Sequence, residues 1–243
     1  MRKCFFVLIG IIVLLYFIFQ IYPKNKMPKL IGEISFDSNY KGEPIVYILE
    51  NDNYVPFIVV TNNYNGNTLL LRRDILPTAC RVNDYSGYYK DSVIDKFLNF
   101  EYLSTLSSIN NSIILSSISI TSESALGVSG SEVENIDRKV FLLSLYEIGI
   151  NTSINAGAEG VPMEYFEKIK NRIAYTDGVA RSWWLRSPNT YYFSCVYGVG
   201  ANGRIGSGNA FDENGIRPAL CVPSTLPISV REDISENNSV YVL

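Results

Sequence analysis

A run of 19 residues without a charged side chain, Cys4–Tyr22, lies near the amino terminus and constrains the fold more than any other feature. As a helix it would span roughly 28 Å, close to the ~30 Å hydrocarbon core of a bilayer. Pro23 would end such a helix. Cleaved signal peptides have shorter apolar regions and small residues at the cleavage site, and Gln20–Tyr22 offers no small pair. We expect an uncleaved signal anchor over residues 1–22, with a cleaved peptide and a buried helix as alternatives.

Positively charged side chains flank this run in nearly equal number at its two ends. Arg2 and Lys3 precede it, whereas Lys24, Lys26 and Lys29 follow it. Cationic flanks favour the cytoplasm, so the flanks alone leave the orientation open. The short amino-terminal tail and the likeness to a signal sequence favour an inside amino terminus. We therefore expect a single-pass cell-membrane protein whose carboxy-terminal domain is extracytoplasmic.

The composition excludes several classes of function. The chain of 243 residues has no His, so Ser-His-Asp and Cys-His catalysis and His-ligated zinc are excluded. The net charge is −3 and the isoelectric point is about 5.2, which argues against a nucleic-acid binder. No pattern indicates a metal or another cofactor. We expect a protein that is not an enzyme and needs no cofactor.

The cysteines that follow the apolar run are odd in number: Cys80, Cys195 and Cys221. They show no Cys-x-x-Cys spacing, which disfavours a zinc site. Three unpaired cysteines that act as small buried hydrophobic side chains are the favoured interpretation, and one disulfide with one free thiol stays open.

Beyond a tether over residues 23–44, the chain predicts a globular domain over 45–222 and a polar tail over 223–243. Short β-branched or apolar runs predict strands at 45–49, 57–61, 69–71, 140–143, 183–185, 192–199, 205–208 and 216–222. Asn/Gly-rich turns at 62–67 and 201–204 predict hairpins. Pro218 predicts an edge or bulge for the last strand.

Helices are expected in the middle of the chain. Asp91 and Ser92 can cap a helix that places Val93, Ile94, Phe97 and Leu98 on one face. A second short helix would carry Leu103, Leu106 and Ile109, and a third would start at Pro162 with Met163, Phe166, Ile169 and Ile173 behind it. The fold class is therefore α+β with a mainly antiparallel sheet.

Two motifs carry a family resemblance: Trp183–Pro188 (WWLRSP) and, after a Gly/Asn-rich hairpin, Gly215–Leu220 (GIRPAL). The pair resembles the signature of the bacterial DUF6273 family, and Lys139–Ser144 is similar to a strand of that family. Asp95 and Phe97 stand where the family usually has Arg and Trp, and Asn189 where Gly is common.

The resemblance implies no established activity. The family pattern looks like that of C-type-lectin-like domains, including the formylglycine-generating-enzyme-like branch, which implies a fold and says little about function.

The two motifs also have a direct physical interpretation. Trp183 and Trp184 point to opposite faces of a strand, so one packs inward and the other outward or under a loop. Arg186 and Arg217 are candidate buried cations that need carboxylate or carbonyl partners. A structural role for all four is favoured. The functional alternative is a sugar- or peptide-binding platform made by an exposed Trp and an Arg.

Candidate binding residues lie on this strand and on the loops and hairpin that follow, because binding residues tend to lie on loops held by a rigid sheet. They are Trp184, Arg186, Tyr191, Tyr197, Asn202 and Arg204. Asp212 and its neighbours Glu213, Asn214 and Asn209 could offer oxygen ligands to Ca²⁺, but their spacing first of all predicts a turn.

These observations favour a membrane-anchored binding module for a glycan or a cell-envelope protein. One alternative is an enzyme acting on envelope polymers, which would need two carboxylates in an open cleft; the sequence shows no such pairing. The other is a structural or assembly domain, which a large exposed apolar patch would favour.

Overall fold

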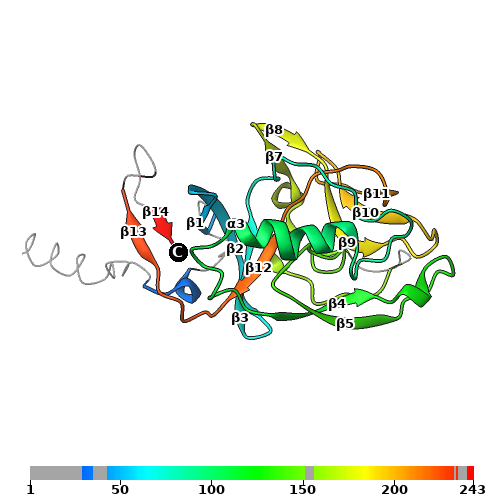
Figure 1. Ribbon diagram of the computed structural model, residues 1–243, viewed down its shortest axis with the longest axis horizontal. Coiled ribbons are helices and arrows are strands. Elements are labelled where there is room, and N and C mark those ends of the chain that lie inside the picture. The colour runs from blue at the N-terminus through cyan, green and yellow to red at the C-terminus, as the bar shows by residue number, and fades with distance from the viewer. Residues whose placement is uncertain (1–28, 35–42, 151–155, 233, 235–239) are drawn as a thin grey trace, which may run out of the picture.

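A seven-stranded sheet, ordered β13-β14-β1-β2-β3-β12-β6, is the largest element of the fold (Figure 1). The computed structural model describes residues 29–34, 43–150, 156–232, 234 and 240–243. Within them, smaller sheets are formed by β11-β10-β9, β4-β5 and β7-β8, and every pairing is antiparallel except β1 with β14. The expected, mainly antiparallel sheet is confirmed.

The strands have the following bounds: β1 Ile45–Glu50, β2 Asn53–Tyr64, β3 Asn67–Arg72, β4 Ser116–Thr121, β5 Val133–Arg138, β6 Val140–Phe141, β7 Ala174–Thr176, β8 Val179–Arg181, β9 Trp183–Pro188, β10 Cys195–Val199, β11 Ile205–Asn209, β12 Ala219–Val222, β13 Ser229–Arg231 and β14 Val240–Val242. Short 3₁₀ turns are η1 Ile31–Glu33, η3 Glu123–Ala125, η4 Glu164–Glu167 and η5 Ile169–Arg172.

The hairpin between β2 and β3 forms where the Asn/Gly-rich turn predicts it. Asn65 and Gly66 both have positive φ, 51° and 81°, as a two-residue hairpin turn requires. Asn and Gly tolerate this backbone at little cost. The turn thereby sets β2 against β3 at the centre of the large sheet.

The carboxy-terminal end of the described chain joins the large sheet, and the amino-terminal end packs against the segment that precedes β13. Val242 of β14 pairs with Tyr47 of β1, and β13 pairs with β14. Ile31 is fully buried, and its amide donates to the carbonyl of Leu226 at 2.9 Å. Parts of the expected tether and polar tail are therefore packed against the domain.

A single helix runs through α2 (Val93–Lys96), the π-helical segment η2 (Phe97–Tyr102) and α3 (Leu103–Thr105), and it crosses the front of the domain in Figure 1. Ser92 caps it as expected, because its Oγ accepts from the amide of Asp95. The expected separate helix over Leu103, Leu106 and Ile109 is wrong. The backbone leaves helical geometry at Leu106, and the following turns bury Leu106 and Ile109 without a helix.

The expected helix after Pro162 is also wrong. Two 3₁₀ turns, η4 and η5, occupy this segment, and Lys168 between them is extended (φ −90°, ψ 122°). Tyr165 and Phe166 are both fully buried, whereas Ile169 is 53% exposed. Burial therefore follows the tertiary packing of adjacent aromatic side chains rather than a helical period.

Pro218 lies just before β12, which sits between β3 and β6 and is not an edge strand. Its missing N–H costs nothing there, because the residue precedes the ladder and its carbonyl accepts from the Arg72 amide at 2.9 Å. The expected edge position is thus corrected.

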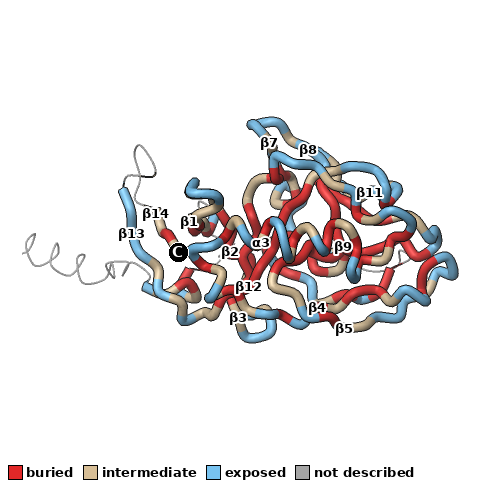
Figure 2. The backbone as a smooth tube through the Cα atoms, viewed as in Figure 1, coloured by how far each residue is buried: buried red, intermediate tan, exposed pale blue. Residues whose placement is uncertain are grey.

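The buried core follows the centre of the large sheet and continues into β9 and β10 (Figure 2). No helix of the described residues is long and apolar enough to cross a membrane, and the expected anchor over residues 1–22 lies outside them. The three cysteines of the described chain are unpaired, as favoured: Cys80, Cys195 and Cys221.

Candidate binding groove

A groove of about 370 Å³ lies on one face of the β9-β10-β11 sheet. Its lining side chains and backbone come from Ser182, Trp184, Gly198, Val199, Gly200, Asn202, Arg204, Ile205, Gly206, Ser207, Gly208 and Asn214. Trp184, Asn202 and Arg204 are three of the candidate residues that the sequence indicates, and the fold brings them together here.

The register of the strands explains why a groove forms. Gly198 stands opposite Trp184 on β9 and opposite Gly206 on β11, so these positions share one face of the sheet. Gly208 lies two residues beyond Gly206 and faces the same way. Three of these four positions have no side chain, which leaves the sheet face uncovered beside the indole.

Two of these glycines lie too close to their neighbours for a side chain. A Cβ on Gly208 would lie 3.2 Å from the indole Cη2 of Trp184, and a Cβ on Gly198 would lie 2.9 Å from the carbonyl oxygen of Trp183 and 3.4 Å from the indole Cε3 of Trp184. The indole thus packs directly against the backbone, and its Nε1 donates to the carbonyl of Cys80 at 3.1 Å. Gly206 differs, because a Cβ there would meet nothing within 4 Å. The open part of the groove is above Gly206.

The β10–β11 turn supplies polar groups at one end of the groove. Asn202 Oδ1 accepts from the Arg204 amide at 3.0 Å, and Gly203 adopts φ 77° against the carbonyl of Ile169. The side chain of Arg204 is exposed, and no hydrogen bond or ion pair holds it within the described chain. It is therefore available to a ligand.

The other candidate residues lie elsewhere. Tyr197 is 5% exposed, and its position on β10 faces away from Gly198 and Trp184. Tyr191 is exposed in the loop before β10 and stacks edge-on against Tyr192, with ring centroids 4.8 Å apart. Trp183 and Trp184 are both buried, at 0% and 3% exposed, so neither forms an exposed platform and Trp184 offers only its edge.

Arg186 is fully buried in an ion pair. Its Nη1 and Nη2 donate to the two carboxylate oxygens of Glu147 at 2.7 and 2.8 Å, while Nε and Nη1 also donate to the carbonyls of Ser119 and Leu142. The hydroxyl of Tyr64 donates to Glu147 Oε1 at 2.6 Å. Burial opposes the charge of Arg186, but the groups around it, Glu147 foremost, together outweigh that effect and raise the pKa of the guanidinium.

A second buried carboxylate, Glu159, belongs to the same network. Its oxygens accept from the amide and the hydroxyl of Thr121 at 2.6 and 2.7 Å, and from the hydroxyl of Ser187. Burial nevertheless raises the pKa of Glu159. Because Glu147 and Glu159 are both 0% exposed, a substrate cannot reach them without rearrangement of the core.

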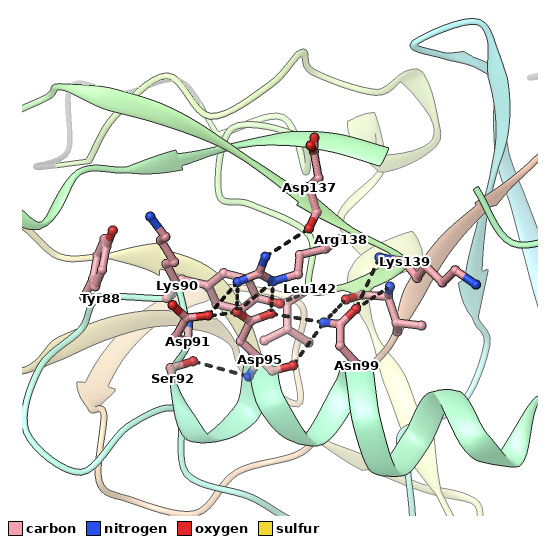
Figure 3. Close-up of polar contacts among 12 residues, drawn as sticks. Tyr88, Lys90, Asp91, Ser92, Asp95, Asn99, Asp137, Arg138, Lys139 and Leu142 are labelled. Carbon is pink, nitrogen blue, oxygen red and sulfur yellow. Dashed lines mark hydrogen bonds and ion pairs between the residues drawn. The ribbon is translucent and has the colours of Figure 1, made fainter. Parts of the chain in front are cut away.

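A second charged cluster joins the helix to β5 and β6 (Figure 3). Arg138 Nε donates to both oxygens of Asp95 at 2.8 and 2.9 Å, and its Nη2 donates to Asp95 and to Asp91. Asn99 donates to the carbonyl of Val140 at 2.9 Å. Asp95, which stands where the family usually has Arg, thus pairs with Arg138. The cluster thereby connects the helix to the sheet.

Hydrogen bonds within the chain hold the side chains of the oxygen-rich turn. Asn209 Nδ2 donates to Asp212 at 3.4 Å, and Asn214 Oδ1 accepts from the hydroxyl of Ser182 at 2.7 Å. Within the described residues, no group of three or more His, Cys, Asp or Glu side chains could hold a metal ion.

The family model described as Domain of unknown function (DUF6273) matches residues 65–224. The chain belongs to this family. The DUF6273 region contains both signature motifs, the groove and the ionic residues of both charged clusters. A search of curated proteins gave no match, and neither did a search of solved structures.

Sequence reasoning missed the glycine floor of the DUF6273 groove. A signal for it exists: glycines alternate along two neighbouring strands, at Gly198 and Gly200 and again at Gly206 and Gly208. With a strand period of two, such alternation places all the glycines of one strand on one face. The register that aligns the two sets depends on the hairpin turn and becomes visible only in the fold.

Proposed function

We propose that this protein is a membrane-anchored, extracytoplasmic binding module and that the β9-β10-β11 groove holds a glycan. The observation that carries the proposal is the groove itself. It combines the edge of a buried indole, a glycine floor that admits a flat polyhydroxylated ring, and the free Arg204 side chain with the amide groups of Asn202 and Asn214. Few precisely placed polar groups around an apolar surface are typical of ligand sites.

The lining of the groove favours binding over cleavage. Glycoside hydrolysis requires two carboxylates beside the bond that breaks. The residues that line this groove include neither Asp nor Glu. A catalyst acting on envelope polymers is therefore the weaker candidate, and Arg204 favours acidic over basic saccharides.

The anchor and the fold analogy belong to the same proposal. The uncharged run Cys4–Tyr22 supports a single membrane pass, and extraction of membranes with alkaline carbonate tests it: the chain should stay with the lipid. A C-type-lectin-like arrangement is supported by the motif resemblance. An experimental structure of the domain that lacked the loop-in, loop-out arrangement of such folds would contradict that part.

The ligand test uses the full-length chain in detergent, with a glycan array and purified bacterial cell-wall polysaccharide as probes, with and without Ca²⁺. Gly206→Leu should weaken binding at least tenfold, because the new side chain occupies the open groove without meeting neighbours. Arg204→Ala should weaken binding of an acidic glycan by about tenfold or more, the effect of a charge-assisted hydrogen bond.

Two matched controls accompany these variants. Ser229→Leu adds the same side chain to an exposed position on β13, and Arg181→Ala removes an exposed cation from β8. Both should bind as the wild type does. Saturable binding that survives Gly206→Leu and Arg204→Ala would place the ligand elsewhere, and the absence of binding to any probe would contradict the glycan assignment.

An exposed aromatic patch favours a second candidate function, docking onto an envelope protein. The patch consists of Tyr85, Tyr191, Tyr192, Phe193 and Phe211, each more than half exposed. Backbone hydrogen bonds hold their segments together: the Gly87 amide donates to the carbonyl of Phe193, and the Asn83 amide to that of Ala210. Large exposed apolar patches are typical of protein-contact sites.

A photo-crosslinking residue placed at Tyr192 tests this candidate in intact cells. It should give one discrete, ultraviolet-dependent adduct with another envelope protein. The same residue at Val230, an exposed position on β13 outside the patch, should give none. Equal adducts from both positions would show that the patch has no special role.

A further inference from the structure

A second cavity, of about 600 Å³, lies on the opposite side of β9 from the glycine floor, where the GIRPAL segment meets the end of β3 and the β7–β8 hairpin. It is lined by Glu43, Arg72, Arg73, Asp74, Ile75, Pro77, Ile173, Tyr175, Thr176, Asp177, Gly178 and Arg217. Its size is that of a pocket for a small molecule. The proposed glycan module makes no use of it.

Arg217 is the unusual member of this lining. It is only 1% exposed, its Nε donates to the carbonyl of Arg72 at 2.9 Å, and its Cζ lies 5.3 Å from the centre of the Trp183 ring. Its Nη1 is buried and has no hydrogen-bond partner. None of the ion pairs within the described chain includes Arg217. Buried charges are almost always paired, and the described residues give this donor no partner, which leaves it open to a ligand.

The other two arginines of the cavity have their partners within the chain. Arg72 makes a bidentate ion pair with Glu50 at 3.0 and 3.1 Å and also donates to two carbonyls. Arg73 pairs with its neighbour Asp74 at 2.9 Å. Arg217 alone among the three arginines therefore has no carboxylate partner.

The rest of the lining restricts the chemistry of the ligand. A guanidinium with a free donor selects a planar carboxylate or a phosphate. Glu43, Asp74 and Asp177 contribute three carboxylates to the same cavity. Asp74 is paired with Arg73, so the carboxylates of Glu43 and Asp177 are the ones that repel a multiply charged anion and attract an ammonium group. We propose that this cavity binds a small zwitterion of the α-amino-acid class, with its carboxylate on Arg217 and its ammonium group toward the acidic rim.

The electrostatic state of Arg217 agrees with this arrangement. Burial lowers the pKa of its guanidinium, and Tyr165, Glu43 and Asp74 only partly offset that effect. A bound carboxylate would neutralise the charge at short range. Binding should therefore stabilise the fold in proportion to ligand concentration.

The test is isothermal titration calorimetry together with thermal unfolding of the full-length chain in detergent. The probes are alanine, acetate, ethylamine and inorganic phosphate. Alanine should bind saturably and raise the melting temperature. Acetate should bind more weakly, because it lacks the ammonium group, and ethylamine and phosphate should not bind.

Two variants assign the site. Arg217→Met should weaken alanine binding about 10- to 100-fold, the value of charge-assisted hydrogen bonds. Asp177→Asn keeps the fold, because Asn tolerates the positive φ of 50° at this turn. It should weaken alanine binding about 1.5- to 5-fold, as expected for an exposed ion pair, and leave acetate unchanged. Asp137→Asn, the same change at an exposed position on β5, is the control and should have no effect.

Three results would overturn the proposal. Phosphate or acetate binding as tightly as alanine would rule out a zwitterion, and alanine binding that is unchanged in Arg217→Met would place it elsewhere. If Arg217→Met does not fold, Asp177→Asn decides: an unchanged preference for alanine over acetate contradicts the acidic rim. Absence of alanine binding at about 10 mM, well above a millimolar dissociation constant, contradicts the site itself.

Discussion

The two signature motifs each bury one arginine, and the two arginines differ in what surrounds them. Arg186 of WWLRSP donates to both oxygens of Glu147 and to two carbonyls. Arg217 of GIRPAL donates to one carbonyl, lies over Trp183, and keeps a buried nitrogen without a partner. The first arginine is neutralised by the chain, which is typical of a structural role. The second is not, which is typical of a binding role.

The balance of charge differs in the same way. Around Arg186 there are two buried carboxylates, Glu147 and Glu159, so acid is in excess and burial raises the pKa of Glu159. Arg217 belongs to none of the ion pairs of the described chain, and burial lowers the pKa of its guanidinium. The Arg186 cluster therefore favours the protonated form of Glu159, and Arg217 keeps a hydrogen-bond donor without a partner in the described chain.

The largest expected effect follows from breaking the Arg186 pair. Arg186→Met should lower the free energy of unfolding by about 3–5 kcal/mol, because Glu147 would remain buried without its counterion. Urea unfolding followed by tryptophan fluorescence measures the loss. Replacing both partners, Arg186→Met with Glu147→Leu, should recover part of it. A loss under about 1 kcal/mol in the single variant would refute the structural role.

Arg217→Met should cost less, about 1–2 kcal/mol, because it removes hydrogen bonds to uncharged groups and one cation–π contact and breaks no ion pair of the described chain. The same urea titration measures it, so the two arginine variants are directly comparable. Arg217→Met as destabilising as Arg186→Met would mean that the contrast between the two sites is wrong.

Local signals in the sequence predicted local structure well. The Asn65–Gly66 turn and the Ser92 cap need only neighbouring residues, and both form as expected. The segment after Pro162 has a helical spacing of apolar residues, but Phe166 is buried together with its neighbour Tyr165, whereas Ile169 is exposed. In this segment tertiary packing, and not the helical spacing of apolar residues, determined which side chains are buried.

The candidate site divides along the same line. Asn202 and Arg204 flank a hairpin turn that a short motif specifies, and both line the groove. Tyr197 could be placed on the correct strand but not on the correct face, because the register of β10 against β9 decides its direction. The partners of Arg186 lie 39 residues away in Glu147 and 67 residues away in Ser119, which no local pattern reveals.

The smallest expected effect concerns the protonation of Glu159 in the Arg186 cluster. With its pKa raised above the ordinary 4.5, Glu159 keeps a proton in the folded chain where the unfolded chain has lost it. The stability that this proton contributes is therefore present below the ordinary pKa of a glutamate. It is lost as the pH rises through the pKa of Glu159 in the folded chain. Glu159→Gln resembles the protonated acid, so the stability of the wild type relative to this variant should fall as pH rises from about 4 to 7. Urea unfolding across that range measures the trend. Glu167→Gln, at an exposed carboxylate, should give a nearly flat difference. If the stability of the wild type instead rises relative to that of Glu159→Gln as the pH increases, Glu159 is ionised in the folded chain, where Arg186 and the hydroxyl donors hold it.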